Sequence, residues 1–168
     1  RETKCSTLRI NWAGQAAFYL GKLAVKEGNS QTALVWFDSV TSGAFEAEAT
    51  LSAVSLLMEQ HRYSEAMNRI DRIQGKFPQQ QLRILVLQAE IYNEQKQYPK
   101  AYKVLTDALK DMPGQKELLY TRSLVSERMG NLPAMEKDLL EILKKYPDDA
   151  AALNALGYTL ASKNQTFC

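Results

Sequence analysis

The sequence has few of the residues that build metal sites and disulfide frameworks. Its 168 residues include two cysteines and one histidine. Cys5 and Cys168 lie at opposite ends, outside any CxxC motif and far from His61, which argues against a disulfide framework and a metal site. The chain also lacks a glycine-rich phosphate-binding loop, and no group of its residues has the spacing of a catalytic constellation. We therefore expect a non-enzymatic protein without a metal or another cofactor.

Long apolar runs and an excess of one charge are lacking as well. No run approaches the roughly 18 apolar residues of a transmembrane helix. The chain has 21 basic and 19 acidic residues and a net charge of +2, which gives no electrostatic reason to expect nucleic acid or an anionic membrane as partner. The first residues do not resemble a signal peptide. Because the sequence starts at Arg1 rather than Met, we expect a fragment of a longer protein.

Helical periodicity, by contrast, extends along almost the whole chain. Apolar residues recur three and four positions apart, and glycine or proline interrupts the pattern at regular places. Residues 1–11 have weak periodicity and are expected to be a frayed end or the remnant of a preceding helix. The expected helices span residues 12–27, 31–41, 45–60, 63–74, 79–96, 98–111, 116–129, 132–145 and 148–163. Asp148 is the expected N-cap of the last one.

The pattern of small and large residues repeats along the sequence. Ala33, Ala66, Ala101 and Met135 are spaced 33, 35 and 34 residues apart. Twelve residues before them stand Gly21, Val54, Ala89 and Ser123, with Gly157 next in step. Four residues after them stand Phe37, Ile70, Leu105 and Leu139. Small residues at facing positions let two helices approach, and such hairpins must stack on neighbours to bury their remaining apolar faces.

At these residues the sequence resembles the tetratricopeptide repeat (TPR), a helix–turn–helix unit of about 34 residues. The match includes Leu20-Gly21 with Ala33 and Phe37, and later Leu156-Gly157. Val54, Ala89 and Ser123 replace the usual glycine, and Met135 replaces the usual alanine. The resemblance implies an all-α, right-handed superhelical solenoid of about four and a half repeats. Residues 1–13 would be an N-terminal extension, with the TPR domain at 14–168 and repeats at about 14–46, 47–81, 82–115, 116–149 and 150–163.

The sequence of residues 146–161 also resembles that of bacterial TPR lipoproteins of the outer membrane. That resemblance implies an adaptor, including for processing proteases, located in the periplasm and anchored at the outer membrane. Two alternatives stay open. The chain could be a cytosolic module like those of chaperones or co-chaperones, or a regulatory domain cut from a larger enzyme.

The resemblance implies that the first helix of each repeat lines a concave groove that binds a protein or peptide. The residues predicted to line it are Phe18, Lys22, Leu51, Ser55, Val86, Glu90, Asn93, Tyr120, Leu124, Glu127, Asn154 and Tyr158. Their apolar stripe with flanking acids suits an extended or helical segment that has apolar anchors and basic residues. For Leu51 and Val86, packing against neighbouring helices is the alternative.

The last expected helix has no hairpin partner within the sequence. Its apolar residues Leu153, Leu156 and Leu160 are therefore predicted to bind a second copy, giving a homodimer, or further repeats of the parent protein. The second helices of the repeats carry basic residues, among them Arg69 and Arg72. We expect these to be solvated faces balanced by acidic neighbours such as Asp71, with a basic surface as the alternative.

Overall fold

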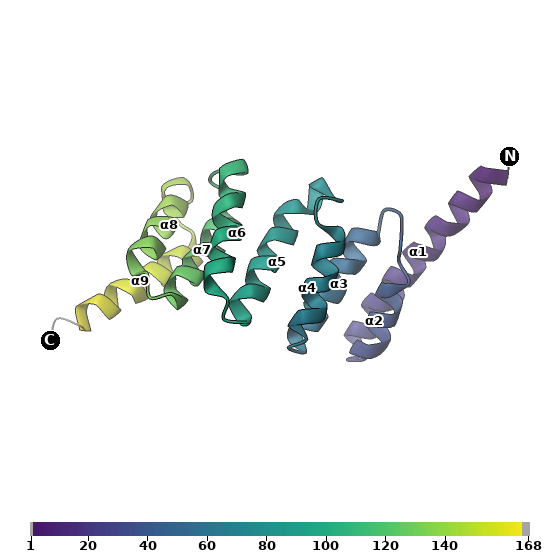
Figure 1. Ribbon diagram of the computed structural model, residues 1–168, viewed down its shortest axis with the longest axis horizontal. Helices are drawn as coiled ribbons and strands as arrows, with labels where there is room; N and C mark the ends of the chain where they lie inside the picture. The colour runs from purple at the N-terminus through teal and green to yellow at the C-terminus, as the bar shows by residue number, and fades with distance from the viewer. Residues whose placement is uncertain (1, 166–168) are drawn as a thin grey trace. The chain divides into compact units, whose positions relative to one another are not determined.

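The computed structural model describes the backbone of residues 2–165 and the side chains of residues 12–161, and all regular elements in this part are helical. They are α1 (Glu2–Lys26), α2 (Ser30–Asp38), α3 (Glu46–Glu59), α4 (Tyr63–Ile73), the short 3-10 helix η1 (Pro78–Gln80), α5 (Gln81–Glu94), α6 (Tyr98–Asp111), α7 (Lys116–Arg128), α8 (Leu132–Lys145) and α9 (Ala150–Gln165) (Figure 1). The chain divides into two compact units, Arg1–Ile84 and Leu85–Cys168. The boundary lies inside α5.

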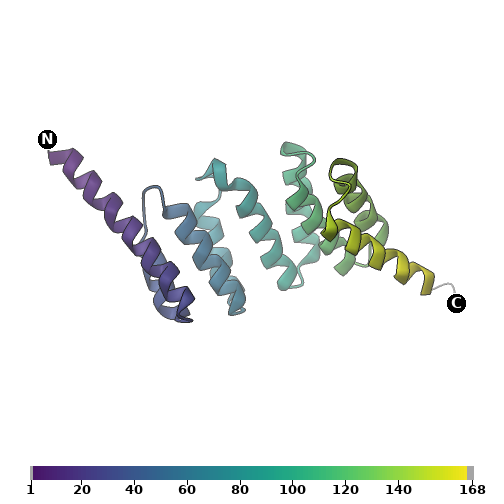
Figure 2. The same cartoon turned by 180° about the vertical axis from the view of Figure 1, so that it is seen from behind.

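In the first unit, α1 pairs with α2 and α3 pairs with α4. A Cβ atom added at Gly21 would lie 2.5 Å from Cε1 of Phe37, so α1 and α2 approach closely because Gly21 has no side chain. Asn29 starts α2 with its side-chain oxygen, which accepts from the Thr32 amide at 3.2 Å. Helix α1 begins at Glu2, well before the expected start at residue 12. The first turns of α1 therefore project away from the other helices of the unit (Figure 2).

The turns inside the hairpins share one backbone feature. Gly28 and Gly130 have φ values of 74° and 71°, and His61 and Lys96 occupy the equivalent turns with 58° and 59°. Glycine reaches this left-handed region without the steric cost of a Cβ atom. His61 lies exposed in its turn, and its Nδ1 atom is 2.7 Å from the Tyr63 hydroxyl.

The second unit is built around a cluster of buried side chains from α7, α8 and α9. Its members are Leu119, Met135, Leu139, Ile142 and Ala152. Met135, which replaces the usual alanine, is buried, and its sulfur accepts a hydrogen bond from the Thr159 hydroxyl at 3.4 Å. The larger side chain therefore reaches from α8 to α9.

The residue that caps the start of α9 differs from the sequence expectation by one position. Asp149, rather than Asp148, is the cap, because its Oδ1 atom accepts from the Ala152 amide at 2.9 Å. The other carboxylate oxygen of Asp149 accepts from Lys116 Nζ at 2.9 Å. This residue thus starts α9 and connects it to the start of α7.

Candidate partner-binding surface

Most of the predicted groove residues that remain accessible belong to the second unit. They lie at equivalent positions of the first helices α5, α7 and α9, and we call them the second-unit surface: Val86, Glu90, Asn93, Tyr120, Leu124, Glu127, Asn154 and Tyr158. Tyr158 is 67% exposed and Leu124 is also exposed, whereas Tyr120 packs partly against the core cluster. The surface therefore presents two large apolar side chains that the core does not bury.

Helix α9 has two accessible sides with different character. Ala152 and Thr159 are buried and define its inner side. Asn154 and Tyr158, four residues apart, share one flank, because residues at this spacing lie on the same helix face. Leu153 and Leu160 lie on the opposite flank and are each 47% exposed. The predicted partner-binding and self-association residues of α9 are thus on separate sides of one helix.

An ion pair fixes the first turns of α7 and α9 relative to each other within the second unit. Lys116 Nζ and Asp149 Oδ2 are 2.9 Å apart. The pKa of the Asp149 carboxyl is lowered, first by the hydrogen bond from the Ala152 amide and then by the one from Lys116. Tyr120 and Leu156 pack against the same core cluster, which further ties these two helices together.

The α5 part of the second-unit surface is rich in hydrogen-bond acceptors. Burial raises the pKa of the Glu90 carboxyl, and the nearby Glu94 carboxylate raises it further. The side-chain oxygen of Asn93 is buried and has no hydrogen-bond partner among the described residues. A buried acceptor without a donor is costly, so Asn93 raises the free energy of the folded state at this position.

In the first unit, two residues that were predicted to line the groove are instead buried in the core. Leu51 is 0% exposed, and Phe18 is buried against the rings of Phe37 and Phe45, with ring centroids 6.1 and 5.2 Å away. Both side chains hold α1, α2 and α3 together instead of facing a partner. The other two predicted residues are not buried. Ser55 donates its hydroxyl to the Leu51 carbonyl at 3.1 Å, and the exposed Lys22 lies 5.9 Å from the centroid of the Phe18 ring.

The described part of the chain contains neither a metal-binding cluster nor a helix suited to span a membrane. Within that part, no group of three or more His, Cys, Asp or Glu side chains is arranged so that it could hold a metal ion. Across the same part, none of the helices combines the length and the apolar character that a membrane span requires.

Comparison with known proteins supports the repeat assignment, although no protein-family model matches the chain. A TPR repeat-containing protein of Pseudomonas aeruginosa is 35% identical over 152 residues, which cover 90% of this chain and 26% of that protein. The chain thus spans about a quarter of the length of this relative.

Solved structures with the same fold are more distant in sequence. A tetratricopeptide repeat protein from Parabacteroides merdae has a TM-score of 0.74 and 17% identity, covering 91% of this chain and 62% of that one. YrrB, a TPR protein with an unusual peptide-binding site, has a TM-score of 0.66 and 14% identity, covering 85% and 74%. Together with the repeat spacing and the helical hairpins, these likenesses show that the chain has the all-α solenoid fold of tetratricopeptide repeats.

Proposed function

We propose that the chain is a non-enzymatic scaffold whose second-unit surface binds a segment of another protein. TPR folds act as protein–protein interaction modules, and YrrB is a fold relative with a peptide-binding site. The observation that carries the proposal is the exposure of Tyr158 and Leu124 on first helices of the repeats. Tyrosine combines a large apolar face with a hydroxyl group, a combination that is enriched where proteins bind each other.

The chemistry of the surface defines the partner. Apolar side chains of the partner would contact Tyr158 and Leu124. Its N–H or ammonium groups would reach the carboxylates of Glu90 and Glu127. A segment with apolar anchors and basic residues between them meets both requirements.

A pull-down with matched variants tests the proposal. The double variant Tyr158→Ala/Leu124→Ala removes the two exposed anchors, whereas Leu140→Ala removes an equally exposed apolar side chain from the second helix α8 of the same unit. Proteins captured from bacterial extract are quantified by mass spectrometry, and folding is checked by circular dichroism. We expect partners that bind the wild type and Leu140→Ala to be lost with the double variant. Equal capture by all three proteins would contradict the proposed surface.

We also propose that the other flank of α9 mediates self-association. Leu153 and Leu160 are both exposed there, whereas Leu156, between them in the sequence, packs partly against the core cluster. Burying the two exposed leucines against a second copy would remove apolar area from water. Multi-angle light scattering should show a mass that rises with concentration for the wild type, and less so for Leu153→Ser/Leu160→Ser. A strict monomer at high concentration would contradict this proposal.

For the cellular role, we propose an adaptor in the bacterial envelope that presents protein segments to a processing protease. The similarity of residues 146–161 to bacterial TPR lipoproteins supports the adaptor role, and the TPR repeat-containing relative from Pseudomonas aeruginosa supports a bacterial origin. Fractionation of cells with an antibody against this chain tests the compartment. Recovery of the protein in the cytosolic fraction would instead favour the alternative that the chain is a cytosolic TPR module like those of chaperones or co-chaperones.

A further inference from the structure

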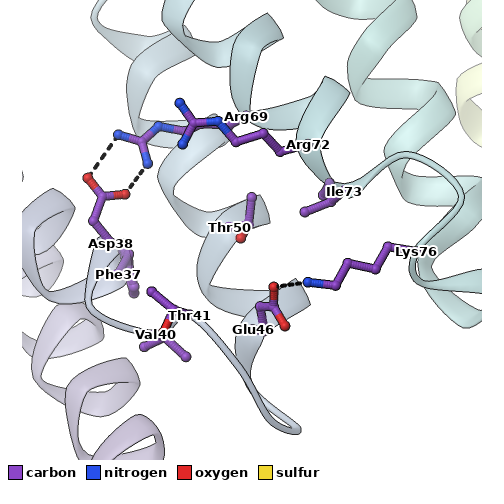
Figure 3. A pocket seen from close by; sticks show the side chains of 10 residues that line it. All are labelled: Phe37, Asp38, Val40, Thr41, Glu46, Thr50, Arg69, Arg72, Ile73 and Lys76. Atoms are coloured by element: carbon purple, nitrogen blue, oxygen red, sulfur yellow. Dashed lines mark hydrogen bonds and ion pairs between the residues drawn. The ribbon is translucent and has the colours of Figure 1, made fainter.

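A pocket in the first unit lies away from the surface proposed above. It has a volume of 290 Å³ and is enclosed by the end of α2, the loop that follows it, the start of α3 and the last turns of α4 (Figure 3). Its polar lining includes Asp38, Glu46, Arg69, Arg72 and Lys76. Phe37, Val40 and Ile73 are buried and form an apolar base below a charged rim.

The rim carries an excess of one positive charge, because three cations, Arg69, Arg72 and Lys76, face two anions, Asp38 and Glu46. Asp38 accepts from both terminal nitrogens of Arg69, one of them at 3.0 Å, and Glu46 pairs with Lys76 (Figure 3). These pairs hold two of the cations in place at the pocket. A positioned charge recognises an anion at a lower entropic cost than a mobile one.

Arg72 supplies the positive charge that the pocket itself does not neutralise. Among the described residues it has no ion-pair or hydrogen-bonding partner, and its side chain extends from α4 toward the same side of the pocket as Arg69 (Figure 3). A guanidinium group presents its N–H donors in a fixed plane that matches both oxygens of a carboxylate. The pocket therefore contains an unused donor with the geometry for one carboxylate.

The repeat framework does not require these basic residues. With the spacing defined by Ala66, Ala101 and Met135, the equivalents of Arg69, Arg72 and Lys76 can be identified in the later second helices. They are Val104, Asp107 and Asp111 in α6, and Asp138, Glu141 and Lys145 in α8. Acidic or apolar residues thus stand at most of these positions. The combination of Arg69 and Arg72 in α4 with Lys76 just after it does not recur at these positions, which separates the three cations from the features that form the fold.

An apolar hollow adjoins the pocket and shares Lys76 with it. It has a volume of 370 Å³, and its lining includes Ala44, Ala47, Phe77 and Pro78. Lys76 Nζ lies 5.4 Å from the centroid of the Phe77 ring, between the charged and the apolar parts. The two hollows together present a site for one anionic group beside an apolar side chain.

We propose that this pair of hollows binds an acidic peptide segment, with a carboxylate at Arg72 and a neighbouring apolar side chain against Phe77 and Pro78. The remaining charges favour a carboxylate over a phosphate, since Asp38 and Glu46 would repel a dianion more strongly than a single negative charge. This site takes a partner of opposite charge from the one proposed for the second unit. It rests on different residues and does not depend on that proposal.

Nuclear magnetic resonance titration of the ¹⁵N-labelled full chain tests the site. The probe is the peptide acetyl-Gly-Leu-Glu-Leu-Gly-amide, and the neutral control has glutamine in place of glutamate. We expect the acidic peptide to shift the backbone signals of Thr50, Ile73 and Lys76, and to bind more weakly as salt rises because screening acts on exposed charges. Arg72→Ala should weaken binding about tenfold, the effect of losing one charged hydrogen-bonding partner.

A charge-matched control separates the site from the net charge of the protein. Lys103→Ala removes one positive charge from an exposed position of α6 in the other unit and should leave the affinity unchanged. The proposal is overturned if the glutamine peptide binds equally well, or if Arg72→Ala has no more effect than Lys103→Ala. It is also overturned if sodium phosphate produces the same shifts with higher affinity, since the pocket would then be a general anion site. The Tyr158 variant should bind the acidic peptide normally.

Discussion

Gly21 and Gly157 occupy equivalent positions in the first and last repeats, yet their surroundings are opposite. A Cβ atom at Gly21 would meet the buried ring of Phe37 at 2.5 Å, whereas nothing lies within 4 Å of one at Gly157. We expect Gly21→Ala to destabilise the protein by about 1–3 kcal/mol through overpacking. Gly157→Ala should stabilise it by about 0.5–1 kcal/mol, because alanine loses less entropy in a helix.

Urea denaturation followed by circular dichroism measures both changes in the free energy of unfolding. The two substitutions add the same methyl group at the same position of the repeat, so each is the control for the other. A loss of stability in both variants would mean that the residue at Gly157 is also closely packed. No loss for Gly21→Ala would mean that the Phe37 ring moves freely.

Glu90 makes the stability of the protein depend on pH in the direction opposite to most carboxylates. Its pKa is raised in the folded protein, chiefly by burial, so the folded state binds this proton more tightly than the unfolded state does. Its contribution to stability is full below the ordinary glutamate pKa and is lost as the pH rises through the raised pKa. We expect Glu90→Gln to gain stability relative to the wild type over this rise, measured by urea denaturation at a series of pH values. Parallel pH profiles for the two proteins would contradict the assignment.

At the scale of the element, the hairpin turns follow one geometric rule with two kinds of residue. Lys96 adopts φ 59° in the turn between α5 and α6, where the equivalent turns after α1 and α7 have Gly28 and Gly130. A left-handed conformation costs a residue with a Cβ atom about 1–2 kcal/mol. Lys96→Gly should therefore raise the free energy of unfolding by about 1 kcal/mol, and Gly130→Ala should lower it by a similar amount. Thermal unfolding measures both variants, and a lower melting temperature for Lys96→Gly would contradict the expectation.

Helix order could be predicted from the sequence because the repeat spacing is regular and glycine or proline marks many of the turns between helices. The ends were harder to predict. Asp148 and Asp149 are both chemically suited to cap α9, and only the position of Lys116 and the Ala152 amide distinguishes them. The early start of α1 could not be predicted from apolar periodicity, because this periodicity arises only where one face of a helix packs against another element. The first turns of α1 extend beyond the neighbouring helices (Figure 2).

The candidate sites were predicted only in part, for a related reason. Repeat position indicates which side of a helix faces outward on average, but burial depends on the residues opposite. Leu51 has the same repeat position as Tyr120, yet it is fully buried, whereas Tyr120 is half-buried. The pocket around Arg72 could not be derived from spacing. It depends on ion pairs between different elements, in which Asp38 of α2 pairs with Arg69 and Glu46 of α3 pairs with Lys76.

At the scale of the whole molecule, tertiary contacts connect neighbours along the chain. In the second unit, α7 contacts α6 and α8, and α8 contacts α9. Repeat arrays of this kind derive their stability from each repeat and from its nearest neighbours. A local defect should therefore open the unit that contains it before it affects the other unit.

The ion pair between Arg122 and Asp138 offers a test of this local behaviour. Arg122 donates to both carboxylate oxygens of Asp138, at 2.8 and 2.6 Å, and the Asp138 side chain is almost fully buried. Asp138→Ala leaves the guanidinium without its partner, and we expect a loss of about 3–5 kcal/mol in stability. Hydrogen exchange measured by mass spectrometry should accelerate in α7 and α8 but not in α1–α4. Lys103→Ala, which breaks an exposed pair with Asp107, should leave exchange unchanged in both units. Faster exchange of Asp138→Ala throughout the chain would instead show that the two units unfold together.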